Sequence, residues 1–94
     1  MAAVQKESPA RVIKDVGRRI AELRRAKGWT QDQLAVQLEV SVQYLRRVEG
    51  GGENLTIKSL VEIARVCGAR TADLLSPPVS RKVVKGRPKG PTAS

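Results

Sequence analysis

The stretch KGWTQDQLAVQLEVSVQYLRRVEGG, residues 27–51, decides the fold, because it carries the signals of two short helices joined by a tight turn. Gly28 follows a run of helix formers and supplies the left-handed position that ends a helix. Thr30 stands three residues before Gln33, a spacing that predicts a reciprocal capping box at the start of a new helix. That helix is expected to turn one apolar face inward: Leu34, Ala35 and Leu38.

The second helix of the stretch is predicted to begin after Ser41. Glu39 and Val40 interrupt the pattern of the first helix, and Ser41 is a favourable N-cap. Apolar residues then recur at three-residue spacing and form the inward face: Val42, Leu45 and Val48. The three glycines at positions 50–52 end this helix.

The outward face of the second helix carries side chains that suit the edges of DNA bases. Gln can pair with adenine, Arg can pair with guanine, and a small apolar group can meet the thymine methyl. The net charge of +9 favours a polyanionic partner. The candidate base-contacting residues are Ser41, Val42, Gln43, Arg46 and Arg47.

These residues resemble the helix-turn-helix family of lambda repressor, Cro and the xenobiotic-response-element regulators over residues 12–75. The resemblance rests on Gly28-Trp29-Thr30-Gln31, Leu34-Ala35, Val40-Ser41, Tyr44-Leu45, Glu49-Gly50, Asn54-Leu55-Thr56-Ile57, Leu60 and Ile63-Ala64. It implies an all-α, compact five-helix bundle that places its third helix in the major groove and forms a homodimer on a palindromic operator. Glu39 departs from the family, which usually has Gly in this turn, and a left-handed non-Gly residue costs about 1 kcal/mol.

Three further helices are predicted outside the stretch. The first covers about residues 11–27, with an inward stripe of Val12, Val16, Ile20 and Leu23. The second covers about 57–66, capped by Thr56, and its inward residues are Ile57, Leu60, Ile63, Ala64 and Cys67. A short helix at about 72–75 is capped by Thr71. Its Leu74 and Leu75 could both complete the core, or one of them could start a dimer interface.

Four residues are candidates for phosphate contacts: Gln31, Tyr44, Arg19 and Arg24. Gln31 lies at a helix N-terminus, where free N–H groups attract anions. The hydroxyl of Tyr44 could reach a phosphate, or the ring could only support its helix. Arg19 and Arg24 belong to a basic helix face that could contact phosphates or be solvated. Glu49 would repel phosphates unless it is paired, so we expect it to meet Arg19 or Arg24.

Composition divides the chain into a flexible arm at 1–10, a helix-turn-helix domain at 11–76 and a disordered basic tail at 77–94. Residues 11–76 carry 12 Lys and Arg against 8 Asp and Glu, whereas residues 77–94 carry five basic residues and no acid. More than half of the excess positive charge therefore lies in the tail.

A short run in this tail, KGRPKGP, resembles an AT-hook. The resemblance implies that Arg87, flanked by Lys85 and Lys89, enters the narrow minor groove of A·T tracts. A single copy is present, and Lys85 replaces the usual Arg. A basic tail that tracks phosphates without specific docking is the alternative.

The residue inventory excludes most enzyme classes. The chain has no His, one Cys and no glycine-rich phosphate loop, so we expect no catalysis, metal or other cofactor. It has neither a membrane-length apolar run nor a secretory apolar core, so we expect a cytoplasmic protein without membrane contact. The sequence predicts a transcription regulator of repressor type that binds double-stranded DNA. The alternative is a protein-interaction adaptor or antitoxin-type module of the same fold, whose basic tail docks on acidic surfaces and whose partner is another transcription protein or a toxin.

Overall fold

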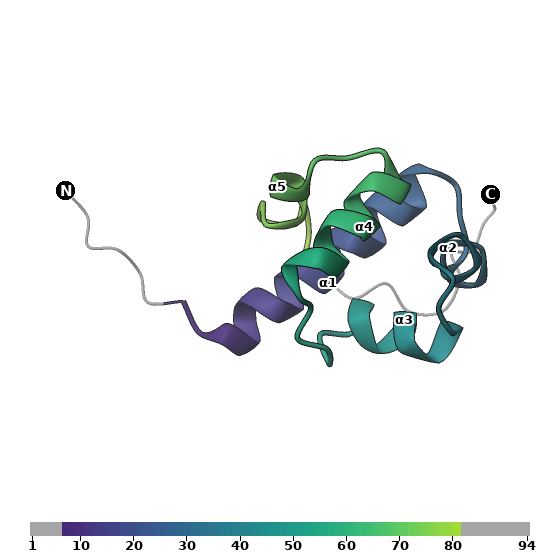
Figure 1. Cartoon of the computed structure of the whole chain (residues 1–94). Coiled ribbons are helices and arrows are strands. Elements are labelled where there is room, and N and C mark those ends of the chain that lie inside the picture. Colours follow the sequence, from purple (N-terminus) through teal and green to yellow (C-terminus); the bar gives the residue numbers. More distant parts are fainter. Residues whose placement is uncertain (1–6, 82–94) are drawn as a thin grey trace.

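The computed structural model describes residues 7–81, and five helices and no strand occur in this part of the chain (Figure 1). The helices are α1 (Pro9–Ala26), α2 (Gln31–Leu38), α3 (Val42–Glu49), α4 (Ile57–Cys67) and α5 (Thr71–Leu74). The predicted all-α, five-helix fold is confirmed. Helix α1 starts earlier than expected, because the Ser8 hydroxyl accepts a hydrogen bond from the Arg11 N–H (3.0 Å) and Pro9 fits the first turn.

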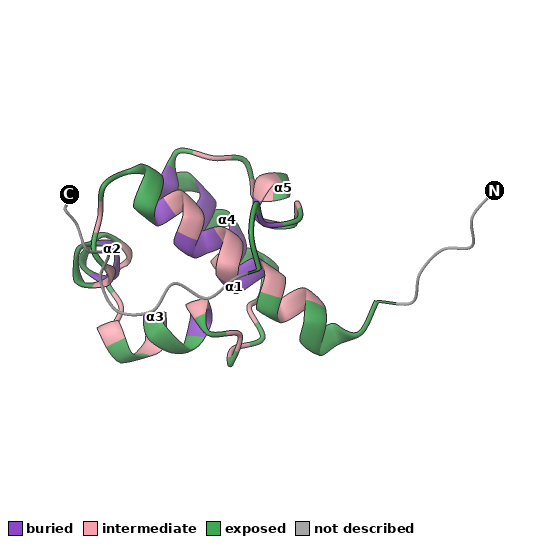
Figure 2. Ribbon diagram, turned by 180° about the vertical axis from the view of Figure 1, so that it is seen from behind, coloured by how far each residue is buried: buried purple, intermediate pink, exposed green. Residues whose placement is uncertain are grey.

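Helices α1 and α4 form the centre of the bundle, with α2 and α5 at opposite ends (Figure 1). Helix α3 packs against both α1 and α2. The buried residues line the inner sides of the helices, and the outer sides are exposed (Figure 2). The largest completely buried side chains come from α1, α2, α3 and α5: Ile20, Leu34, Leu45, Val48 and Leu74.

The predicted core is largely confirmed, with two differences in α4 and α5. Ile57 was expected to point inward, but it is 70% exposed, because the inner face of α4 begins only at Leu60. Leu74 is completely buried, whereas Leu75 is 56% exposed. Cys67 is a buried core residue as expected, and burial raises the pKa of its thiol.

The start of α5 also differs from the prediction. Thr71 was expected to cap the helix, but it is the first helical residue, and Arg70 occupies the N-cap position. The Asp73 carboxylate accepts a hydrogen bond from the backbone N–H of Arg70 (2.9 Å). Asp73, inside the first turn, therefore satisfies the backbone N–H of Arg70, and the Thr71 hydroxyl does not cap the helix.

Helices α1 to α4 all end with the same backbone motif. After each helix comes a residue with positive φ, and the next residue donates its N–H to the carbonyl five positions back. The four left-handed residues are Gly28, Glu39, Gly51 and Gly68. Glu39, with φ 60° and ψ 42°, adopts the conformation that glycine would adopt, so the turn between α2 and α3 keeps its shape without glycine.

We expect Glu39→Gly to stabilise the domain by about 1 kcal/mol, because glycine removes the left-handed strain. Urea unfolding measures the change. Gly28→Ala is the matched control: a β carbon there meets nothing within 4 Å, so only its positive φ opposes alanine, and we expect a loss of similar size. Destabilisation by both substitutions would contradict the prediction for Glu39.

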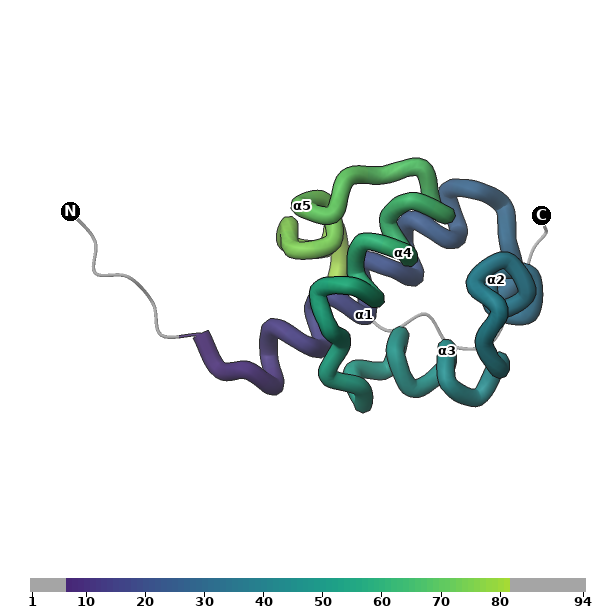
Figure 3. Tube along the Cα trace, viewed as in Figure 1, coloured from purple at the N-terminus to yellow at the C-terminus, as the bar shows by residue number. Residues whose placement is uncertain are grey.

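Residues 77–81, which we call the strap, pack against α1 (Figure 3). Pro78 is buried, and the Glu22 carboxylate accepts hydrogen bonds from the N–H groups of Val79 (3.0 Å) and Ser80 (3.1 Å). Two guanidinium nitrogens of Arg81 donate to the Asp15 carboxylate at 2.8 and 2.9 Å.

The tail predicted from residue 77 therefore begins with residues that lie against α1, because Glu22 and Asp15 accept hydrogen bonds from Val79, Ser80 and Arg81. The remaining tail, with Lys85, Arg87 and Lys89, lies outside the described residues, as do residues 1–6 of the predicted arm. Among the helices of residues 7–81, none is long and apolar enough to cross a membrane.

The strap should loosen in acid. Partial burial alone would raise the pKa of Glu22, but hydrogen bonds from Val79, Ser80 and Arg19 hold it below its ordinary value. Since the folded pKa of Glu22 is the lower one, its stabilisation of the fold is complete above the ordinary value of about 4.5 and disappears as pH falls through the folded value.

In an NMR titration, we expect the amide protons of Val79 and Ser80 to shift together as Glu22 is protonated. Glu22→Gln should abolish this shared movement. Core methyl signals, such as those of Ile20, serve as the control that the domain stays folded. Amide shifts that do not change with pH while Glu22 titrates would contradict the prediction.

Candidate nucleic-acid interface

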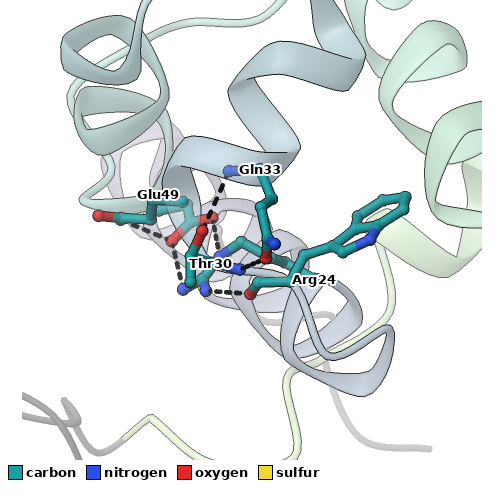
Figure 4. Close-up of polar contacts among 6 residues, drawn as sticks. Arg24, Thr30, Gln33 and Glu49 are labelled. Atoms are coloured by element: carbon teal, nitrogen blue, oxygen red, sulfur yellow. Dashed lines mark hydrogen bonds and ion pairs between the residues drawn. The ribbon is translucent and has the colours of Figure 1, made fainter.

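Local hydrogen bonds fix the starts of α2 and α3. The Thr30 hydroxyl accepts from the Gln33 N–H (3.1 Å), and the Gln33 side-chain oxygen accepts from the Thr30 N–H (2.8 Å). The predicted capping box is thus confirmed (Figure 4). The Ser41 hydroxyl caps α3 by accepting from the N–H of Tyr44 (3.0 Å), as expected.

A buried ion pair joins these helices to α1 (Figure 4). Arg24 donates to the Glu49 carboxylate through Nε (2.8 Å) and Nη2 (3.1 Å), and the two side chains are only 10% and 6% exposed. Nη1 of Arg24 donates to the Trp29 carbonyl (2.9 Å), and Nε2 of Gln31 donates to Glu49 (2.9 Å). The predicted internal partner of Glu49 is confirmed as Arg24, and the network ties the end of α3 to α1 and α2.

Hydrogen bonds within the domain also occupy Arg24 and Arg19, the two arginines expected to contact phosphates. Arg24 is buried because it lies four residues after Ile20, on the inner stripe of α1. Arg19 donates to the Asp73 carbonyl (3.0 Å) and to Glu22 (3.2 Å), so it joins α1 to α5. Both guanidinium groups are committed to acceptors within the domain.

The outward face of α3 carries three exposed polar side chains, Gln43, Arg46 and Arg47. Ser41 is exposed at the N-terminal edge of this face. Val42 is half-buried and packs against the core, so it offers less surface to a partner than expected. Leu45 and Val48 anchor the opposite side of α3 in the core.

The two remaining phosphate candidates lie beside this face. Gln31 occupies the first position of α2, half-buried, with its amide oriented by Glu49. Tyr44 is half-buried and packs against the core, and the guanidinium of Arg47 lies 5.8 Å from the centre of its ring. Tyr44 therefore supports α3, and no contact of its hydroxyl is needed for that role.

Glu53 is the residue of this surface that the sequence analysis missed. Its carboxylate accepts a hydrogen bond from Nε of Arg47 (2.9 Å). The signal was the glycine run at 50–52, because a left-handed Gly51 folds the chain back onto the last turn of α3. Within residues 7–81, no group of three or more His, Cys, Asp or Glu could hold a metal ion.

A family model described as a helix-turn-helix domain matches residues 15–76 of the chain. The chain belongs to this helix-turn-helix domain family. The uncharacterized HTH-type transcriptional regulator y4dJ of Sinorhizobium fredii is 39% identical over 62 residues, which are 66% of this chain and 80% of that relative.

Two solved structures share the fold of this helix-turn-helix domain. The restriction-modification controller protein C.AhdI of Aeromonas hydrophila is 29% identical with a TM-score of 0.62, over 66% of this chain and 94% of that one. The hypothetical transcription factor NHTF from Neisseria, 23% identical, has a TM-score of 0.69 over 83% and 90% of the two chains. Family membership thus places the chain among DNA-binding transcription regulators.

Proposed function

We propose that this protein reads specific sequences in double-stranded DNA by placing α3 in the major groove. The observation that carries the proposal is the outward face of α3, where Gln43, Arg46 and Arg47 are exposed together. Gln suits adenine and Arg suits guanine, and both present paired donors or acceptors to one base. The core contacts and the Arg24–Glu49 pair hold α3 rigidly, as direct base reading requires.

Contacts with the phosphate backbone of the DNA would then come from α2, the helix that precedes α3. Gln31 and the free N–H groups of the first turn of α2 can receive a phosphate, because helix N-termini attract anions. Tyr44 is the second candidate of this kind. The basic tail, including Lys85, Arg87 and Lys89, adds phosphate or minor-groove contacts in this proposal.

Specific binding by so small a domain also calls for a homodimer. One recognition helix covers few base pairs, and two helices on a pseudo-palindrome would read half-sites about 34 Å apart. An adaptor or antitoxin-type module is the rival function. It would not need polar side chains on α3 that suit base edges, so the α3 surface favours the DNA-reading function.

Substitution on α3 tests the proposal. We expect Gln43→Ala and Arg47→Ala each to weaken binding to a selected operator by about 1–3 kcal/mol, with much smaller losses on random duplex. Fluorescence anisotropy on both duplexes measures the difference. Arg65→Ala is the charge-matched control, because Arg65 is an exposed basic residue on α4. Equal losses on operator and random DNA would contradict base reading by these residues.

A further inference from the structure

The loop after α3 returns an acidic residue to the base-reading face. Gly51 has φ 83°, and the Gly52 N–H donates to the Arg47 carbonyl (2.8 Å), so the chain turns back along the last turn of α3. A β carbon on Gly51 would lie 3.0 Å from atoms of Lys14, so α1 leaves little room for another loop path. This turn places Glu53 beside Arg47, where the two form an ion pair at 2.9 Å.

Arg47 is held from two sides. Glu53 binds its Nε, and its guanidinium carbon lies 5.8 Å from the centre of the Tyr44 ring. Tyr44 packs against the core, so the ring is a fixed support. A free arginine side chain loses much rotamer freedom when it binds, and a side chain that is already placed loses less.

The ion pair leaves the terminal nitrogens of Arg47 for DNA. Glu53 accepts from Nε, and the arginine fork also has donors on Nη1 and Nη2, which can contact O6 and N7 of guanine. The Arg47 side chain is 56% exposed although it is paired, so the pair does not withdraw it from the surface.

A carboxylate beside a DNA-reading helix is unfavourable for general DNA affinity, because it repels phosphates. Its presence is explained if it raises discrimination between sequences, which is a difference of affinities. We propose that Glu53 is a positioning residue that orients Arg47 and thereby sets the specificity for the base pair that Arg47 reads. This inference rests on the proposed function, because it assumes base contact by Arg47.

Glu53→Gln in the full-length chain tests the inference, since it removes the charge with little change of shape. The readouts are dissociation constants on the selected operator, on random duplex and on operators altered at single base pairs. The base pair read by Arg47 is the one at which Arg47→Ala loses discrimination. We expect Glu53→Gln to lower discrimination at that base pair by about tenfold, to leave other positions unchanged and to tighten binding to random duplex.

Two further variants make the result decisive. Glu62→Gln removes the same charge from a pair on α4, with Arg65, and should leave discrimination unchanged. In an Arg47→Ala background, Glu53→Gln should no longer alter discrimination at any position. Thermal unfolding of each variant checks that the fold is retained.

Several outcomes would overturn the inference. If Glu53→Gln tightens operator and random duplex equally, with discrimination unchanged everywhere, Glu53 acts only as a negative charge. If it changes neither affinity nor discrimination, the ion pair has no role in DNA binding. In both cases a preferential operator loss in Arg47→Ala would leave the proposed function intact. If Arg47→Ala itself shows no such preference, the proposed function fails first and the inference fails with it.

Discussion

Glu49→Ala is expected to destabilise the domain by about 3–5 kcal/mol, because it leaves the buried guanidinium of Arg24 without its charge partner. Such a loss is a large fraction of the roughly 5–15 kcal/mol that stabilises a small domain. It also removes the acceptor of Gln31, so α1, α2 and α3 lose their common contact. Urea unfolding of the variant and the parent measures the loss.

The exposed Arg47–Glu53 pair provides the control for this prediction. Glu53→Ala removes an equally short ion pair from the surface, and we expect it to cost less than about 1 kcal/mol. Replacing Arg24 and Glu49 together by Met and Leu should cost less than either single loss, since no buried charge remains unpaired. A Glu49→Ala loss as small as that of Glu53→Ala would contradict the structural role of the pair.

Gly17→Ala is expected to be the second severe change, with a loss of about 3 kcal/mol. A β carbon at position 17 would overlap the carbonyl oxygen of Val48 and lie 2.7 Å from that of Glu49. Both obstacles are backbone atoms of α3 and cannot rotate away, so α1 and α3 would have to separate. Alanine is otherwise favoured over glycine inside a helix by about 1 kcal/mol. A net loss of stability would therefore show that the close contact between Gly17 and the α3 backbone outweighs this preference.

Gly52→Ala is the matched control, because the nearest atom to its added β carbon is the Arg47 carbonyl oxygen at an ordinary 3.5 Å. We expect a change below about 1 kcal/mol for this variant. Thermal or urea unfolding distinguishes the two glycines. A Gly17→Ala variant as stable as the parent would mean that α1 and α3 can separate without cost.

The sequence predicts features that depend on neighbours along the chain. The Thr30–Gln33 capping box, the Ser41 cap and the left-handed Gly28 each need only residues within one turn, so the local pattern is sufficient. The apolar spacing also places Leu34 and Leu45 in the core, because helical periodicity fixes which residues share a face.

Features that depend on distant partners were missed or misjudged. The sequence offers Arg24 both as a phosphate contact and as a partner of Glu49, and only the fold, which places Glu49 beside it from 25 residues away, shows which of the two contacts forms within the domain. The strap looks like part of a disordered tail until Asp15 and Glu22 supply its acceptors. Glu53 contacts Arg47 because the glycine loop at 50–52 turns the chain back, and helical periodicity does not predict the path of a loop.

Selection of bound duplexes from a random DNA pool tests most directly whether α3 reads base sequence. The chain of 94 residues should recover a pseudo-palindromic motif with half-sites about 34 Å apart. Gln43→Ala and Arg47→Ala should each relax a different base pair of that motif, while Arg65→Ala should recover it unchanged. A recovered pool that matches the input, or an unchanged motif with both α3 variants, would contradict base reading by α3.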